Sequence, residues 1–461
     1  MSTVLLAEPE RPDVLERSPA STVGRARRGR LRAGLAVGVA LVGVLAVAAG
    51  VDDSQQSAAR PAAVVVPSGC SAPRWVSAWQ AATQPAPGDP ALAGATLRMI
   101  VHPQVTGAQV RIRLSNAYGT APLAVGTASA GRSDGAAGLL PGSMRPVTFA
   151  GSPEVVIPAG GSVVSDPAPL VAEVGRPIAV SFYLPAAPAV VTQHAIALQT
   201  SYLARSADAA LATAGTAFDR PVGSWLVLDG LDVLAPRPEN AVVAVGDSIT
   251  DGFGTALDAN ARWSDALAAR LAAAGGASDM AVLNAGISRN RLLADDPAGD
   301  GDAPLTRFDR DVAAAPGVTD VVLHIGTNDI AAGRPAGEII AGLERYTERA
   351  RAAGKRVFLT TITPSVAGPH GTPAALSTRA AVNAWVLGEG REHADGVFDF
   401  AAAVADPAQP ARLAPAFDSG DGLHLSAAGY QALARAVDVA RLSGSPCLAD
   451  TSPARIVLSG S

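Results

Sequence analysis

Cysteine, lysine and aromatic residues are scarce in this chain. Among 461 residues there are two cysteines, Cys70 and Cys447, and their spacing does not resemble a cysteine-based metal site. Lys355 is the only lysine, and the net charge of −5 gives no basic footprint for binding nucleic acid. Only 4% of the residues are aromatic, and no long apolar segment near the motifs described below is typical of a lipase lid. The last two of these absences do not favour a long-chain lipid as a ligand.

One long apolar run is present, near the N-terminus. Five arginines at 25–32, at the end of the basic region 1–32, precede an uncharged apolar run at 33–51, which nearly spans a hydrocarbon core of about 30 Å. This pattern predicts a signal peptide or a signal-anchor helix, and a buried core helix is the third alternative. We therefore expect an extracytoplasmic protein, secreted or anchored to the cell membrane through residues 33–51. The following segment, 52–69, is typical of a flexible linker.

The segment 70–236 has the pattern of an antiparallel β-sandwich domain. Val110, Ile112 and Leu114 alternate with arginines, and a second period-2 run lies at 178–184. Such alternation, interrupted by glycine and proline, is typical of strands with one face packed on a core. No convincing helical pattern occurs before residue 263.

The pattern then changes, and segment 237–461 predicts an α/β domain. Strands that alternate with helices predict a parallel sheet covered on both faces, with an active site at the carboxyl ends of its strands. The expected strands are 242–245, 281–283, 320–325, 356–361 and 397–400, and the expected helices are 263–274, 304–315, 336–353, 378–388 and 426–439.

Polar motifs follow these strands where a cleft is expected. A Gly-Asp-Ser motif ending at Ser248 follows the first strand, and an Asn-Ala-Gly motif ending at Gly286 follows the second. A Gly-Thr-Asn-Asp motif containing Asn328 follows the third strand. The segment "DSGDGLHL", with Asp421 and His424, precedes the last helix. All four motifs are expected at one edge of the sheet.

These residue types suit acyl transfer. A serine hydroxyl is a weak nucleophile that needs an adjacent base, which His424 can supply to Ser248. Asp421, three residues before the histidine, can orient the imidazole. The oxyanion of a tetrahedral intermediate needs donors, and we expect the amides of Ser248 and Gly286 and the side-chain amide of Asn328 to provide them. The catalytic set is therefore Ser248, Asp421 and His424.

Other polar residues near these motifs have less specific interpretations. Arg289 and Asn290 follow the expected oxyanion glycine and are candidates for substrate contacts. Asp247 and Asp329 are expected to hold turns rather than to act in catalysis. The remaining histidines form no ligand cluster, and His324, inside a strand, is expected to be a core residue. We expect no metal and no cofactor.

The four motifs together resemble the four blocks of the SGNH (GDSL) hydrolases, over roughly residues 241–442. In this resemblance Ser248, Gly286, Asn328 and His424 match the four lettered residues, and Asp421 matches the acid of the triad. The resemblance implies a flavodoxin-like three-layer α/β/α SGNH hydrolase domain, here preceded by the β-sandwich domain. The stretches "NAGISRNRLL", "RFDRD" and "DSGDGLHL" also resemble xylanase-associated esterases with an N-terminal β domain. One departure is Leu425, where family members usually have proline.

The function implied is that of an exported serine esterase working through an acyl-enzyme. Resemblance to the esterase subgroup suggests short acyl or acetyl esters, in small molecules or linked to polysaccharide. A lipase, a thioesterase or an acyltransferase on the same triad remains an alternative within enzymes. An alternative of another class is a carbohydrate-binding surface protein with incidental hydrolase activity.

The two cysteines lie at the two ends of the expected folded part. In an oxidising compartment this placement predicts a disulfide between Cys70 and Cys447. The alternative is two buried free thiols, which the loop-like surroundings "PSGCSAP" and "SGSPCLAD" disfavour.

Overall fold

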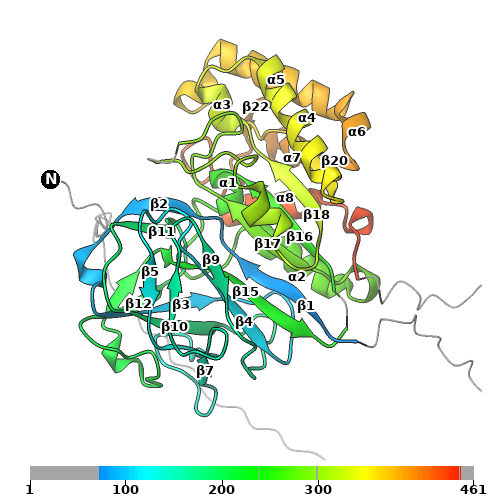
Figure 1. Cartoon of the computed structure of the whole chain (residues 1–461). Coiled ribbons are helices and arrows are strands. Elements are labelled where there is room, and N and C mark those ends of the chain that lie inside the picture. The colour runs from blue at the N-terminus through cyan, green and yellow to red at the C-terminus, as the bar shows by residue number, and fades with distance from the viewer. Residues whose placement is uncertain (1–71, 238, 297–298, 446, 448–461) are drawn as a thin grey trace, which may run out of the picture. The chain divides into compact units, whose positions relative to one another are not determined.

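The computed structural model describes residues 72–237, 239–296, 299–445 and 447, which fall in one compact unit (Figure 1). A β region of antiparallel sheets is followed by an α/β region with a parallel sheet, which confirms the predicted fold class. The expected basic region, apolar run and linker at 1–69 lie outside the described residues. The predicted boundary between the two regions, at residues 236 and 237, stays a prediction.

The β region is built from short strands that pair only antiparallel. Its two larger sheets have the strand orders β1-β15-β4-β9 and β13-β12-β3-β10-β6-β7, and two smaller sheets have the orders β14-β11-β2 and β5-β8. The strands are β1 (Arg74–Gln80), β2 (Gln84–Pro87), β3 (Ala95–Val101), β4 (Val110–Ser115), β5 (Leu123–Val125), β6 (Ala128–Arg132), β7 (Arg145–Val147), β8 (Val155–Ile157), β9 (Ser162–Val164), β10 (Ile178–Leu184), β11 (Val190–His194), β12 (Ser201–Ala204), β13 (Arg220–Val222), β14 (Trp225–Leu226) and β15 (Leu228–Ala235), with 3₁₀ turns at η1 (Pro90–Leu92) and η2 (Gly215–Ala217).

Strand β10 differs from the expected pattern of one packed face. Its alternating large residues are buried, but so are Ala179 and Ser181 on the opposite face. The second face is covered because Arg98 of β3 lies buried there, with its Nε 2.8 Å from Ser181 Oγ and its guanidinium over the Phe218 ring. A buried arginine whose donors are satisfied thus replaces solvent on that face.

The parallel sheet of the α/β region has the strand order β17-β16-β18-β19-β20, which is the flavodoxin-like order 2-1-3-4-5. Its strands are β16 (Ala241–Gly246), β17 (Ala281–Gly286), β18 (Val318–His324), β19 (Arg356–Thr360) and β20 (Gly396–Phe398), and a small hairpin pairs β21 (Ala405–Asp406) with β22 (Gln409–Leu413).

Alternate residues of β16 pack into two different cores. Val243 faces a core that includes Leu343 of α4, whereas Val242 faces a core that includes Leu267 of α2 and Leu433 of α8. Helices therefore cover both faces of the sheet, as a parallel sheet requires. The α-helices are α1 (Ser248–Asp251), α2 (Trp263–Ala274), α3 (Thr327–Ala331), α4 (Ala336–Ala352), α5 (Pro373–Leu387), α6 (Gly390–His393), α7 (Phe400–Val404) and α8 (Ala427–Ala436), with short turns at η3 (Gly276–Ser278), η5 (Gly368–Gly371) and η6 (Val439–Arg441).

One expected helix is mostly absent. The segment 304–315 contains only a five-residue π-helix, η4 (Asp309–Ala313). Within this segment Arg307 is fully buried and donates to the carbonyl oxygens of Ala285 and Gly246. Its side chain thus reaches the ends of β17 and β16, and these contacts accompany a single π turn instead of a regular helix.

The two regions are joined by direct contacts. The amide of Ser77 in β1 donates to the carbonyl of Pro316 at 2.9 Å, and Gln80 Nε2 donates to the carbonyl of Asp311 at 2.7 Å. Tyr118 of the β region donates its hydroxyl to Asp302 at 2.8 Å. The β region therefore contacts the α/β region through several separate segments.

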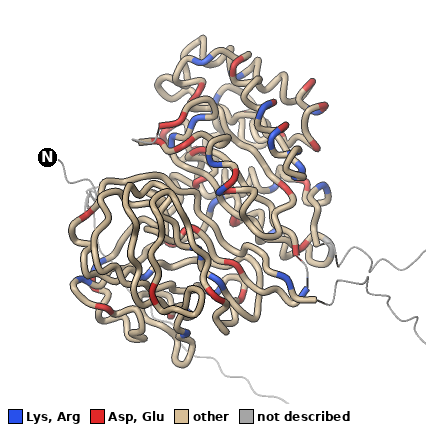
Figure 2. Tube along the Cα trace, in the orientation of Figure 1, with Lys and Arg blue, Asp and Glu red and all other residues tan. Residues whose placement is uncertain are grey.

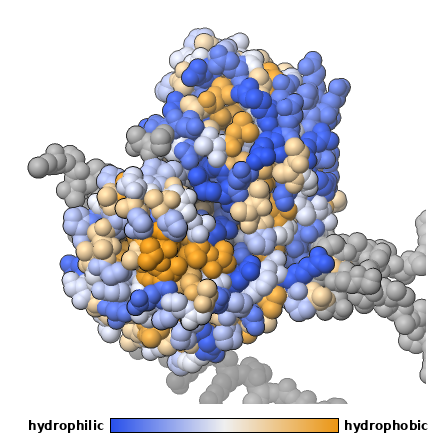
Figure 3. Space-filling model, viewed as in Figure 1, coloured by the Kyte–Doolittle hydropathy of each residue, from blue (hydrophilic) through white to orange (hydrophobic). Residues whose placement is uncertain are grey.

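Basic and acidic residues are interspersed along the described chain (Figure 2). The face in Figure 3 carries a gathering of hydrophobic residues on the β region. Among the described residues no helix is long and apolar enough to cross a membrane. No described cysteine is free, but Cys70 lies outside the described residues, so its disulfide with Cys447 stays a prediction.

Candidate active site

Ser248 lies at the carboxyl end of β16, where the strand turns directly into α1. Asp247 caps this helix, because its Oδ1 accepts the amide hydrogen of Ile249 at 3.1 Å. Gly246 is required at the turn, since a Cβ there would lie 2.3 Å from the carbonyl oxygen of His324 on the neighbouring strand. The turn thus places Ser248 as the first residue of a helix at the end of the sheet.

His424 and Asp421 meet Ser248 from the loop before α8. His424 Nε2 lies 2.9 Å from Ser248 Oγ, and His424 Nδ1 lies 2.6 Å from Asp421 Oδ2. These distances form an unbroken hydrogen-bond chain from the serine through the imidazole to the carboxylate. The structure therefore brings together the three residues that the sequence predicted as the catalytic set.

Asp421 is held as an anion by its own loop. Its Oδ1 accepts the amide hydrogens of Leu423 at 2.9 Å and His424 at 2.8 Å. Partial burial opposes ionisation, but the hydrogen bonds from the His424 side chain and from these amides outweigh it and lower the pKa of Asp421 to about 2. A charged carboxylate therefore faces His424 Nδ1 at neutral pH and favours the tautomer with a proton on that nitrogen.

Phe253 is a site residue that sequence reasoning missed. Its ring lies over the His424 imidazole, with ring centroids 4.4 Å apart, and it remains 41% exposed. The imidazole is therefore bounded by Asp421 on one side and an aromatic face on another. Only the position of Phe253, five residues after Ser248, could have signalled this contact.

The structure does not support Gly286 as an oxyanion donor. Its amide donates to Oδ1 of Asn284 at 2.9 Å, and the residue is buried at the end of β17. A Cβ at this position would lie 2.3 Å from the amide nitrogen of Asp251, so glycine is needed for close packing against α1. The role of Gly286 is to let the strand end approach the helix of Ser248.

Arg289 presents a backbone amide close to the end of the same strand. Its φ of +68° is unusual for a residue with a side chain. Between Gly286 and Asn290 the other amides have acceptors, whereas within the described residues the Arg289 amide has none. The Arg289 side chain is 79% exposed and forms an ion pair with Asp300 at 2.9 Å. The turn therefore offers a free donor that the sequence did not reveal.

Asn328 lies in α3, directly after β18, and is half-buried. Its Nδ2 donates one hydrogen to the carbonyl of Asn290 at 3.0 Å, which leaves the second hydrogen available. Asn290, a candidate for substrate contact in the sequence, has its side chain inside the fold. That side chain is fully buried, donates to the carbonyls of Asp300 and Asp302, and accepts from Arg307.

The two aspartates expected to hold turns do so in different ways. Asp329 links α3 to the segment that follows Asn290, because its carboxylate accepts the amide hydrogens of Leu292 and Leu293. Asp247 is fully buried, and burial, together with the nearby charges of Asp329 and Asp251, raises its pKa to about 7 despite the Ile249 amide.

The histidines outside the site have structural partners. His324 is buried, its Nδ1 lies 2.8 Å from Thr360 Oγ1, and burial lowers its pKa to about 3, as expected of a core histidine. Within the part of the chain that the structure describes, no group of histidine, cysteine, aspartate or glutamate side chains is arranged to hold a metal ion.

The α/β region is similar to known proteins. Residues 244–432 match the model of the GDSL-like lipase/acylhydrolase family. Similar solved structures include a carbohydrate acetylesterase from Sinorhizobium meliloti, with 20% identity over 43% of this chain and 96% of that one and a TM-score of 0.34. They also include the M. smegmatis aryl esterase, with 19% identity over 43% of this chain and 95% of that one and a TM-score of 0.35. None of the curated proteins compared with the chain matches it.

The assignment rests on the family model and on the residues that the motifs bring to one site. The family match begins four residues before Ser248 and ends eight residues after His424, so it contains every residue of the predicted catalytic set. The chain therefore carries a GDSL-like lipase/acylhydrolase domain and is an enzyme of the SGNH hydrolase type.

Proposed function

We propose that this protein is a serine esterase that cleaves carboxylic esters through an acyl-enzyme on Ser248. The observation that carries the proposal is the hydrogen-bond chain Ser248–His424–Asp421, with distances of 2.9 and 2.6 Å. A serine whose proton can pass to a neighbouring imidazole, itself oriented by a carboxylate, is an activated nucleophile.

In the acylation step, Ser248 Oγ attacks the ester carbonyl carbon and its proton moves to His424 Nε2. The carbonyl electron pair moves onto oxygen, and the resulting anion is stabilised by the amides of Ser248 and Arg289 and by Asn328 Nδ2. Collapse of this intermediate breaks the bond to the alcohol oxygen, which leaves with the proton from His424. Water then attacks the acyl-enzyme by the same route and releases the acid.

We further propose a substrate with a short acyl group and an action outside the cytoplasm. Within the described chain no long apolar helix covers Ser248, and the aromatic side chain that contacts His424 is the single ring of Phe253. Export is supported by the five arginines and the apolar run at 33–51. Acetyl esters of polysaccharides are the natural substrates that the sequence resemblance favours.

Hydrolysis of nitrophenyl esters of graded acyl length tests this function. We expect turnover of the acetyl ester by the full chain, and a loss of several orders of magnitude in kcat for Ser248→Ala. Ser77→Ala is a matched control, because Ser77 is a buried serine of β1 that lies outside the predicted catalytic set. Wild-type turnover by Ser248→Ala would reject the function, and a steady rise in rate toward the dodecanoyl ester would reject the short acyl group.

A further inference from the structure

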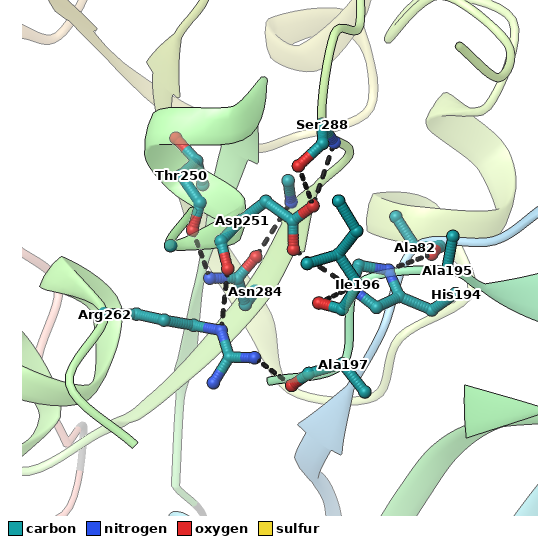
Figure 4. A network of polar contacts seen from close by, with 12 residues as sticks. Ala82, His194, Ala195, Ile196, Ala197, Thr250, Asp251, Arg262, Asn284 and Ser288 are labelled. Atoms are coloured by element: carbon teal, nitrogen blue, oxygen red, sulfur yellow. Dashed lines mark hydrogen bonds and ion pairs between the residues drawn. The ribbon is translucent and has the colours of Figure 1, made fainter. Parts of the chain in front are cut away.

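A histidine of the β region reaches the helix that carries Ser248. His194, the last residue of β11, has its Nε2 3.0 Å from Oδ1 of Asp251, the last residue of α1. Their side chains are only 4% and 2% exposed. Figure 4 shows the imidazole beside the Asp251 carboxylate, with Ser288 on its far side. A buried polar contact thus links the β region to the nucleophile's helix.

Both ring nitrogens of His194 have partners on the protein. Nδ1 lies 2.8 Å from the carbonyl oxygen of Ala82, and Nε2 also lies 3.2 Å from the carbonyl oxygen of Ile196. Both ring nitrogens therefore face oxygen acceptors, whereas a neutral imidazole has only one N–H.

The other oxygen of Asp251 holds the turn that contains Arg289. Asp251 Oδ2 accepts the amide hydrogen of Ser288 at 2.9 Å and its hydroxyl hydrogen at 2.6 Å. Ser288 directly precedes Arg289, whose amide is a proposed oxyanion donor. The carboxylate therefore joins His194 on one oxygen to the oxyanion turn on the other.

The backbone of α1 is held independently of this carboxylate. Arg262 Nε donates to the Asp251 carbonyl at 2.8 Å, and its NH2 group donates to the carbonyl of Ala197. Asn284 Nδ2 donates to the carbonyl of Thr250 at 2.6 Å. Loss of the His194 contact would therefore leave the Asp251 carboxylate held by Ser288 alone, while the backbone of α1 stays in place.

We propose that His194 is a positioning residue of the esterase site, acting through Asp251 and Ser288 on the amide of Arg289. This inference rests on the proposed esterase function. The β region would then supply a group on which turnover depends, although no atom of that group touches substrate. Because the effect is on the oxyanion donor, it belongs to the transition state and should change kcat more than KM.

The test compares His194→Phe with His194→Gln in the full chain, using nitrophenyl acetate. His194→Phe keeps a ring but removes the donor, and we expect kcat to fall by about 10- to 100-fold with KM within about twofold. His194→Gln retains an N–H at similar reach and should recover most of the lost kcat. Ser288→Ala should also lower kcat. In the double variant of His194→Phe and Ser288→Ala, kcat should fall by less than the product of the two single effects, since both substitutions act through one carboxylate.

His102→Phe is the matched control for disturbance of the contact between the two regions. His102 also comes from the β region and contacts Asn260 of the α/β region at 3.3 Å, but it does not touch Asp251. The His102→Phe substitution should leave kcat within about twofold of the wild-type value. Thermal unfolding of each variant identifies any that fails to fold. If His194→Phe fails to fold, Ser288→Ala decides, because it should lower kcat with KM within about twofold of the wild-type value.

Wild-type kcat in a folded His194→Phe variant, or equal losses in the two His194 variants and His102→Phe, would overturn the inference. So would a rise in KM with kcat unchanged. Wild-type protein without Ser248-dependent hydrolysis would instead reject the esterase function, and the inference would be rejected with it.

Discussion

At the scale of the residue, the pKa values of two carboxyl groups near the nucleophile are shifted in opposite directions. Hydrogen bonds from His424 and two amides overcome partial burial and lower the pKa of Asp421 to about 2. Asp247 accepts one amide hydrogen and is fully buried, and its pKa is raised to about 7. The aspartate that faces His424 is therefore the one that is firmly charged at neutral pH.

Asp247 makes the stability of the protein depend on pH. A carboxyl group with a folded-state pKa of about 7 and an unfolded value near 4 binds more protons when folded. Its contribution to stability is complete below about pH 4 and is lost as pH rises to 7, at up to about 1.4 kcal/mol per pH unit. Chemical denaturation at several pH values should show this fall in the wild type and a shallower one in Asp247→Asn. Equal slopes in the two proteins would contradict the assignment.

Asn328 should matter for turnover rather than for substrate binding. Its Nδ2 is fixed by the carbonyl of Asn290 and retains one hydrogen for an oxyanion. Loss of one such donor typically costs about 10²–10³ in kcat. Steady-state kinetics of Asn328→Ala should show that loss with little change in KM. A rise in KM alone would make Asn328 a substrate contact instead.

At the scale of the element, the long periodic segments were predictable and the short ones were not. The helix 263–274 was predicted with the bounds of α2, and each expected strand of the parallel sheet overlaps an observed one. Helices α1, α3, α6 and α7 have four or five residues, too few to show a 3.6-residue period. The expected helix 304–315 is replaced by a single π turn, in a segment where Arg307 is buried against the ends of β16 and β17.

The sequence also predicted only part of the site. The residue types and order of Ser248, Asp421 and His424 were enough to predict their meeting, since polar segments that follow the strands share one edge of a parallel sheet. Sequence could not show that the Gly286 amide is already bonded to Asn284, nor that the Arg289 amide has no acceptor within the described part of the chain. These facts depend on backbone angles and close packing that no motif encodes.

Gly286 and Gly337 offer a direct contrast between two glycines. A Cβ at Gly286 would lie 2.3 Å from the amide nitrogen of Asp251, whereas a Cβ at Gly337 in α4 would meet nothing within 4 Å. Gly286→Ala should lower the free energy of unfolding by about 1–3 kcal/mol, and Gly337→Ala should raise it by about 0.4–1 kcal/mol. Urea denaturation measures both. A neutral Gly286→Ala substitution would show that the strand end and α1 are not tightly packed.

At the scale of the whole molecule, the β region and the α/β region share contacts and a continuous core. Val76 of β1 belongs to the same hydrophobic core as Leu283 of β17 and Leu343 of α4. A Cβ at Gly317 would lie 2.7 Å from the Val76 side chain, so the two regions approach closely there. Contact of this kind differs from that of loosely tethered domains, which move relative to one another.

We expect the described part of the chain to unfold in a single thermal transition. Exposing either region alone would uncover the shared core and break the contacts of Ser77, Gln80 and Tyr118. Differential scanning calorimetry should therefore give one peak, with equal calorimetric and van 't Hoff enthalpies. Two resolved peaks would show that the regions are independent folding units.

Covalent labelling is the sharpest test of Ser248 as the nucleophile. An organophosphonate reacts with a serine that is activated by an adjacent base, and the adduct mimics the tetrahedral intermediate. Incubation of the full chain with such a reagent, followed by peptide mass spectrometry, should place one adduct on Ser248 and abolish hydrolysis. Labelling of another residue, or an inactivated enzyme with an unmodified Ser248, would contradict the account.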